Sequence, residues 1–521
     1  MAKIPKKENK NIEFKERLSP EYHLREDKLQ HLATQMKYRL DLGKGEAIYI
    51  LGVKDYGEIL GLNDIELEES LNVLKAVADE IGAEIQKIEK FVENGKQICK
   101  VLIVKAAKKK MEHLIIGVCG HVSHGKSTLI GTLMKGKPDK KKKNWLILNI
   151  LPHEIERELS ADLHHALIGF NGSKPVLPKN PLSKKDKEKV IESSERVISF
   201  VDTVGHEPWL RTTIRGILGQ NIDYGLLVVA ADDGITHITK EHLGLLLATG
   251  IPVIVCITKI DKVGKKKVEK VEKEVSLLLK NVGKVPFMIK EERDIGIVKD
   301  KLSLVTPIIK TSAVTMEGYN FLYKLLSLIP TREKEYEKPF LMYIDKVYNI
   351  SGVGTVLSGT IKQGKLVVGK KMLIGPTKDN RFVEVKIKSI ETHYYRLKEA
   401  LAGLIVGVAI KGGIKYEDIE RGMVICGKEL KPKPVKSFEA DITVLSHPTR
   451  IKSGYEPVFH CYTIAESVKL ELLDKKYLKA GESGRAKIMF KYRTRVLNVG
   501  DKFIFREGKT KGIGVVKKII R

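Results

Sequence analysis

The sequence predicts a chain of four parts: a small N-terminal α/β domain, a mostly parallel α/β domain, and two β-barrel domains. Three observations support this fold class. The length of 521 residues exceeds what one hydrophobic core usually serves. Apolar, strand-like runs alternate with helix-like segments over residues 114–330, and beyond residue 339 short strands separated by glycines take over. We expect the domains to cover residues 1–110, 111–332, 333–432 and 433–521.

The N-terminal part has the pattern of a separate α/β domain. Helical spacing of apolar residues predicts two helices, and short apolar runs predict strands. The lysine-rich stretch at 105–110 marks a linker. Nothing here has the spacing of a catalytic site, so ligand binding or a role in packing alone both stay open. The predicted elements are helices at 24–40 and 65–81 and strands at 47–53, 58–60 and 98–104.

The second part alternates continuous apolar strands with helices, which is typical of a parallel sheet covered on both faces. A basic, polar stretch at 135–144 is predicted to be a mobile loop. The predicted strands are at 114–119, 197–201, 226–230, 252–257 and 307–310, with helices at 127–135, 239–248 and 267–279.

The last two parts read as β-barrels. Glycines at 352, 354, 359, 364 and 369 are spaced like the corners of hairpins. A Lys-Pro-Lys-Pro linker at 431–434 precedes further predicted strands at 438–445, 457–463, 486–491 and 512–516.

The composition indicates a globular protein with a polyanionic partner. The net charge of +28 suits RNA phosphates, although a lysine-rich surface of the kind found in heat-adapted proteins is the alternative. No apolar run is long enough to span a bilayer, and the first ten residues lack an apolar signal segment. The five cysteines form no Cys-x-x-Cys pair, which indicates buried free thiols and no zinc site. We expect a cytoplasmic monomer with no membrane partner.

The first chemical motif follows a predicted strand and opens a predicted helix. It fits the pattern G-x-x-x-x-G-K-[ST], in which glycines let the backbone curl so that its N–H groups point at phosphate oxygens. We expect Lys126 to reach the β- and γ-phosphates and the Ser127 hydroxyl to ligate Mg²⁺. The motif consists of Gly120, His121, Val122, Ser123, His124, Gly125, Lys126, Ser127 and Thr128.

The second motif, residues 202–206, lies at the end of a predicted strand. There Asp202 is placed to hold Mg²⁺ through water, and the Gly205 N–H to bond the γ-phosphate, so that this loop senses that phosphate. His206 is the candidate catalytic residue, which would orient the attacking water. A solvent-exposed loop histidine is the alternative.

The third motif, Thr258, Lys259, Ile260 and Asp261, follows another predicted strand. A carboxylate at Asp261 accepts hydrogen bonds from guanine N1 and N2, which adenine cannot offer. By itself Lys-x-Asp is usually a solvated pair, but in this order and spacing it predicts guanine nucleotides. Ser312 and Ala313 would complete the pocket with a backbone N–H to guanine O6.

These motifs resemble the translation-factor GTPases typified by elongation factor Tu. The resemblance covers residues 112–521 and includes the barrel segments 352–359, 505–508 and 512–516. A closer similarity is to the GTP-binding protein 1 and 2 group. It rests on the N-terminal domain and on the segments 153–156, 239–245 and 258–261.

Two positions depart from the relatives. Ser123 stands where they usually carry an aspartate that helps hold a monovalent cation, so the use of that cation is in question. Residues 156–162 contain no threonine to close on Mg²⁺ and the γ-phosphate. Ser160 is expected to replace it as a Mg²⁺ ligand; a polar turn residue is the alternative.

The resemblance implies a GTPase that binds GTP, GDP and Mg²⁺ and turns over slowly without a partner. It further implies action with the ribosome and with tRNA or another RNA, and a possible exchange factor. Two other functions stay open: an RNA-surveillance adaptor that recruits mRNA-decay machinery, and a nucleotide-dependent binding protein with little hydrolysis.

Overall fold

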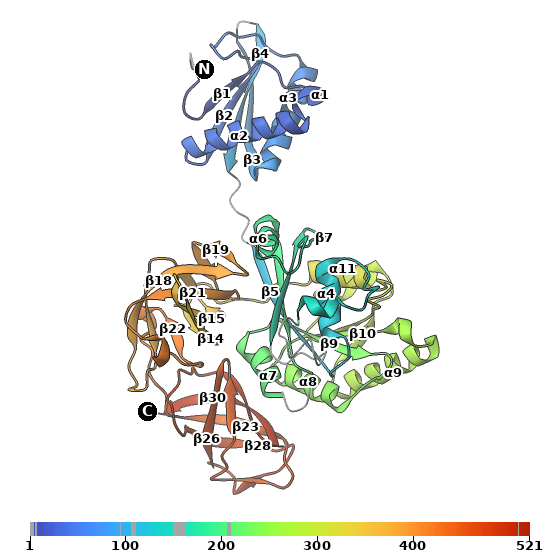
Figure 1. Ribbon diagram of the computed structural model, residues 1–521, viewed down its shortest axis with the longest axis vertical. Helices are drawn as coiled ribbons and strands as arrows, with labels where there is room; N and C mark the ends of the chain where they lie inside the picture. The colour runs from blue at the N-terminus through green and yellow to red at the C-terminus, as the bar shows by residue number, and fades with distance from the viewer. Residues whose placement is uncertain are drawn as a thin grey trace. The chain divides into compact units, whose positions relative to one another are not determined.

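The computed structural model describes residues 5, 8–93, 95–105, 111–148, 163–205, 210–508 and 510–520. It contains two compact units, Met1–Lys110 and Met111–Arg521 (Figure 1). Among the described residues, no helix is both long enough and apolar enough to cross a membrane.

The N-terminal unit is a four-stranded sheet with helices packed on one face. The strand order is β1-β2-β4-β3, in which β1 runs parallel to β2 and the other pairs are antiparallel. Met36 and Val73 of the helices pack on Tyr49 and Val101 of the sheet. Its elements are β1 (Ile12–Lys15), α1 (Pro20–His23), α2 (Glu26–Leu42), β2 (Glu46–Leu51), α3 (Asp64–Glu80), β3 (Ala83–Glu93) and β4 (Lys96–Lys105).

One predicted element of this unit is wrong. Residues 58–60 form no strand, because Ile59 makes only an isolated bridge to Val53. Gly57 and Gly61, on either side, have φ angles of 86° and 74°, and these left-handed turns break the extended backbone.

The α/β domain of the second unit is built on an eight-stranded sheet in the order β11-β12-β10-β9-β5-β8-β6-β7. The strands from β11 to β8 are parallel, whereas β6 and β7 add an antiparallel edge. The predicted mostly parallel sheet is therefore confirmed. The strands are β5 (Glu112–Gly120), β6 (His164–Asn171), β7 (Lys174–Val176), β8 (Arg196–Asp202), β9 (Tyr224–Ala230), β10 (Val253–Thr258), β11 (Val285–Met288) and β12 (Val305–Lys310).

Helices cover both faces of this sheet, and each face has its own core. Leu129 of α4 and Leu322 of α11 pack with Val118 on one face, whereas Leu243 of α8 and Val271 of α9 lie in the core of the other. The helical elements are α4 (Lys126–Lys135), η1 (Asn144–Ile147), α6 (Lys184–Ser193), α7 (Leu210–Ile214), the π-helical turn η3 (Arg215–Gly219), α8 (His237–Ala248), η4 (Ile260–Lys262), α9 (Lys265–Asn281), α10 (Glu292–Val298) and α11 (Tyr319–Leu328).

Two β-barrels follow, as predicted. In the first, β13 pairs with both β22 and β15, which closes the ring β13-β22-β17-β18-β21-β15. Its elements are β13 (Leu341–Tyr343), β14 (Lys346–Ile350), β15 (Gly354–Gln363), β16 (Lys365–Val367), β17 (Lys371–Gly375), β18 (Val383–Thr392), β19 (Tyr395–Leu397), β20 (Glu399–Leu401), β21 (Ile405–Lys411), η5 (Tyr416–Asp418), β22 (Val424–Cys426) and η6 (Lys428–Leu430).

The second barrel closes in the order β23-β28-β26-β25-β29-β30. Its strands are β23 (Ser437–Ser446), β24 (Ile451–Lys452), β25 (Val458–Cys461), β26 (Ile464–Leu472), β27 (Tyr477–Leu478), β28 (Ser483–Phe490), β29 (Lys502–Glu507) and β30 (Thr510–Ile520).

Gly359 is not the hairpin corner that its spacing predicts. It lies inside β15, where a Cβ atom would stand 2.3 Å from the carbonyl oxygen of Tyr343. Glycine is needed there for close contact between the backbones of two strands.

The first barrel is joined to two inner strands of the α/β sheet by hydrogen bonds among buried and partly buried groups. His113 Nδ1 lies 2.9 Å from the Gly403 carbonyl oxygen, and its Nε2 lies 2.8 Å from Ser199 Oγ. The same hydroxyl lies 2.7 Å from His393 Nε2. These bonds connect β5 and β8 to two loops of the barrel.

Candidate nucleotide-binding site

The loop between β5 and α4 has the backbone that its glycines predict. Gly120 has a φ of 142°, and a Cβ atom there would lie 2.3 Å from the Val228 carbonyl oxygen of β9. Gly125 has a φ of 87° and forms the N-terminal cap of α4. Ser123 also has a positive φ, 61°, which is uncommon for a residue other than glycine. The loop therefore curls around the N-terminus of α4, where backbone N–H groups suit an anion.

A histidine of α8 fixes the start of this loop. The Gly120 N–H donates to His242 Nδ1 over 2.9 Å. His242 is buried, and burial lowers its pKa to about 3, so the ring is neutral and able to accept. The sequence assigned no role to this residue.

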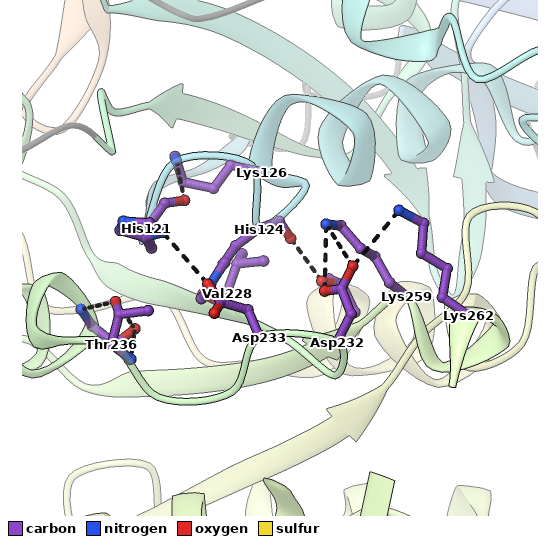
Figure 2. A network of polar contacts seen from close by, with 11 residues as sticks. His121, His124, Lys126, Val228, Asp232, Asp233, Thr236, Lys259 and Lys262 are labelled. Atoms are coloured by element: carbon purple, nitrogen blue, oxygen red, sulfur yellow. Dashed lines mark hydrogen bonds and ion pairs between the residues drawn. The ribbon is translucent and has the colours of Figure 1, made fainter. Parts of the chain in front are cut away.

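Lys126 is buried beneath the loop. Its Nζ donates to the His121 carbonyl oxygen over 3.0 Å (Figure 2). Burial lowers the pKa of Lys126, and the nearby Asp202 opposes that shift. Gly205 packs directly on this amine: its carbonyl accepts from the Val122 N–H over 3.1 Å, and a Cβ atom on it would lie 2.3 Å from Lys126 Nζ.

The predicted magnesium ligands Ser127 and Asp202 lie together. Ser127 Oγ donates to Asp202 Oδ2 over 2.6 Å, and Asp202 is buried at the end of β8. A hydroxyl and a carboxylate next to this loop supply hard oxygen ligands, which fit Mg²⁺.

The third motif lies across the loop from these residues and is tied to it. Thr258 Oγ1 donates to the His124 carbonyl oxygen over 2.6 Å. Lys259 has a φ of 57°, which turns the chain after β10. Asp232 forms ion pairs with Lys259 and with Lys262, at 3.3 and 3.6 Å.

A cavity of about 150 Å³ opens between the loop and the third motif. The predicted residues Gly125, Thr128, Thr258, Lys259, Asp261 and Ala313 all line it. Ser312, next to Ala313 in the chain, is buried, and its N–H donates to the Glu317 carbonyl oxygen.

Further residues at this cavity were not expected from the sequence. Tyr319 and Asp139 also line it. The stretch expected to be a mobile loop contains Asp139, which is buried and accepts from the backbone N–H groups of Lys143 and Asn144. In the sequence, the one indication that this stretch is ordered was an acidic residue, Asp139, among the lysines of residues 135–144.

The structure thus brings together the described residues of all three predicted motifs. His206 and Ser160 lie outside the described residues, so their predicted roles stay predictions. Asp232 and Asp233 were overlooked, although two carboxylates directly after an apolar strand indicate a site at the carboxyl edge of a parallel sheet.

These features define a P-loop nucleotide-binding protein: a curled loop above a buried lysine, a hydroxyl–carboxylate pair, and a cavity beside them. Three models of elongation factor Tu match the chain: the GTP-binding domain at residues 111–345, domain 2 at 354–426 and the C-terminal domain at 431–520. The chain belongs to the elongation factor Tu-type family of translation-factor GTPases, and the predicted family is confirmed.

Known relatives resemble both the whole chain and its family core. GTP-binding protein 2 of Homo sapiens is 33% identical, over 99% of this chain and 88% of its own length. GTP-binding protein 1 of Xenopus laevis is 32% identical, over 94% and 76%. Elongation factor 1-alpha of Pyrococcus abyssi is 33% identical, over 70% and 83%.

Solved structures share the fold. A bacterial selenocysteine-specific elongation factor superposes with a TM-score of 0.59 at 22% identity, over 78% of this chain and 58% of that one. The elongation factor SelB from Methanococcus maripaludis, in complex with a GTP analogue, gives 0.57 at 20% identity, over 79% and 80%.

Proposed function

We propose that this chain is a GTP-hydrolysing switch that binds GTP or GDP with Mg²⁺ and acts with the ribosome and tRNA or another RNA. The observation that carries the proposal is the Ser127–Asp202 pair, 2.6 Å apart, beside the buried Lys126. A cavity lined by Asp261 adjoins this pair, so phosphate and base chemistry meet in one place.

Each residue of the site would have a separate role in GTP hydrolysis. Lys126 would stabilise the charge that develops on the β–γ bridge and γ-oxygens. Ser127 and Asp202, and Ser160 by sequence, would hold Mg²⁺, which supplies further stabilisation of that charge. Gly205 would contact the γ-phosphate, and His206 would orient water for in-line attack.

The partner is proposed from charge and from the relatives. A net charge of +28 favours a surface rich in phosphates, and relatives include proteins named as elongation factors. Hydrolysis in isolation should be slow, because His206 would need a partner to set it in place.

The proposal also covers setting and organisation. The five cysteines are buried and form no disulfide, which supports the reducing cytoplasm. We retain the predicted domain limits of 1–110, 111–332, 333–432 and 433–521, a monomeric state and a possible exchange factor.

GTP turnover with and without ribosomes tests the function, using wild type and His206→Ala. We expect ribosomes to accelerate wild-type turnover at least about a hundredfold and the variant to lose most of that gain, as general acid–base groups supply about 10²–10⁴-fold. GDP binding of the variant, measured in parallel, should be unchanged. Unaltered stimulation of the variant would refute the role of His206.

The same assay separates the alternatives. Tight GTP binding without turnover under either condition would favour a nucleotide-dependent binding protein. Crosslinking to messenger RNA in place of tRNA and ribosomal RNA would favour an RNA-surveillance adaptor.

A further inference from the structure

Two histidines of the phosphate loop, the segment between β5 and α4, converge on one carboxylate in the turn that follows β9. His124 Nε2 lies 2.9 Å from Asp233 Oδ2, and His121 Nδ1 lies 3.7 Å from the same oxygen (Figure 2). One ligand atom from each residue lies within 4.8 Å of the others. Neither side chain is needed for the roles proposed above for Lys126, Ser127 and Asp202.

His124 is held between two oxygen atoms. Its ring is 1% exposed; Nδ1 lies 3.3 Å from the Val228 carbonyl oxygen, and Nε2 faces Asp233. A neutral imidazole carries one proton and can donate to only one of these oxygens. Burial lowers the pKa of His124, so the doubly protonated ring is disfavoured.

A cation bound at Nε2 satisfies both sides of this ring. Nδ1–H then donates to the Val228 carbonyl, and Asp233 meets the cation. Metal-bound histidines typically donate their second ring N–H to a carboxylate or backbone carbonyl in this way.

His121 supplies an independent observation. Its Nδ1 atom is buried and forms no hydrogen bond with any residue that the structure describes. The two imidazole rings lie edge to face, with centroids 5.2 Å apart. A buried ring nitrogen beside a carboxylate oxygen, without a hydrogen bond, is a ready donor for a metal ion.

We propose that His121, His124 and Asp233 form a binding site for a divalent d-block cation such as Zn²⁺, with solvent in the open position. Two imidazole nitrogens and one carboxylate are a common zinc donor set, whereas Mg²⁺ prefers oxygen ligands. The cysteine pattern gave no sign of it because no thiolate takes part. The site is distinct from the Ser127–Asp202 pair and does not depend on GTP hydrolysis.

Metal titration of the full chain tests the site. The protein is stripped with EDTA, dialysed into buffer with excess Mg²⁺ and no nucleotide, and titrated with Zn²⁺ by calorimetry and with Co²⁺ by visible absorption. Asp233→Asn keeps an oxygen acceptor for His124 but removes the anionic ligand. Asp232→Asn is the matched control, because it removes the same charge at the neighbouring position, which pairs with Lys259 and Lys262.

Wild type and Asp232→Asn should bind one equivalent of Zn²⁺, with tetrahedral Co²⁺ bands, and Asp233→Asn should bind at least about tenfold more weakly. His121→Phe, which keeps a ring in place, should weaken binding as well. Equal affinity of wild type and Asp233→Asn, or equal loss in Asp232→Asn, would overturn the proposal. So would loss of binding in Ser127→Ala, which would place the ion at the nucleotide site.

Discussion

Asp261 lines the cavity, and we propose that it selects the base. Its carboxylate would accept from the guanine N–H groups, whereas an asparagine offers an N–H₂ donor. Xanthine has a carbonyl where guanine has its 2-amino group. Asp261→Asn should therefore bind GDP at least about a hundredfold more weakly, because charged hydrogen bonds contribute roughly 1.5–3 kcal/mol each, and should gain affinity for XDP.

Equilibrium binding of fluorescent GDP and XDP measures this exchange. Asp379→Asn, which changes a mostly exposed carboxylate in the first barrel, is the control and should bind GDP as wild type does. If Asp261→Asn kept the wild-type preference for GDP, another residue would have to read the base.

At the scale of elements, the phosphate loop and the strand end of β8 are packed too closely for any side chain at Gly205. A Cβ atom there would lie 2.3 Å from Lys126 Nζ and 2.6 Å from the Val122 nitrogen. Gly205→Ala should displace the loop and slow GTP hydrolysis by about a hundredfold, the cost of a misplacement of about 1 Å.

Gly244→Ala is the matched control for that variant. Gly244 lies within α8, and nothing lies within 4 Å of a Cβ atom built on it. Alanine is the better helix former by about 1 kcal/mol, so this variant should unfold at a higher temperature and hydrolyse GTP at the wild-type rate. Wild-type hydrolysis by Gly205→Ala would contradict the close packing.

The sequence predicts buried elements well and exposed ones poorly. β9 and β10 are buried along their whole length, so their apolar runs stand out between helices. β3 is mostly exposed and carries charged residues on both faces, so its alternation is hidden. β6 was missed although most of it is buried, because it joins the sheet in the antiparallel sense and so falls outside the alternation of parallel strands and helices on which the prediction rests.

The candidate site, too, was predicted only in part from the sequence. Loop motifs are local, so residues 120–128 and 258–261 could be read from spacing alone. Contacts such as Gly120 with His242, 122 positions apart, depend on how strands pair in space. The Ser312 N–H donates to the Glu317 carbonyl, a contact within a local turn that spacing alone does not reveal.

For the molecule as a whole, acid should weaken the contact between the α/β domain and the first barrel. Burial lowers the pKa of His113 from 6.5 to about 4. The unfolded chain takes up a proton at this residue before the folded chain does, so stability falls as the pH drops from about 6.5 to about 4. The loss reaches roughly 3 kcal/mol at the lower end.

His113→Gln tests this dependence, since glutamine keeps one donor and one acceptor but does not titrate. The variant should show a flatter decline of melting temperature between pH 7 and pH 4 than wild type, with some loss of stability at pH 7. Parallel curves for the two proteins would show that His113 does not govern acid sensitivity.

The hydrogen bonds from Gly403 through His113 and Ser199 to His393 also have a fixed order of donors and acceptors. If His113 donates from Nδ1 to the carbonyl, its Nε2 must accept from the serine hydroxyl, which in turn accepts from His393. Each member therefore fixes the position of the next member's proton, and the three bonds form one series with a single direction. Rotation of the first barrel against the α/β sheet would strain all three bonds together. We therefore expect the α/β domain and the first barrel to separate cooperatively, in one step.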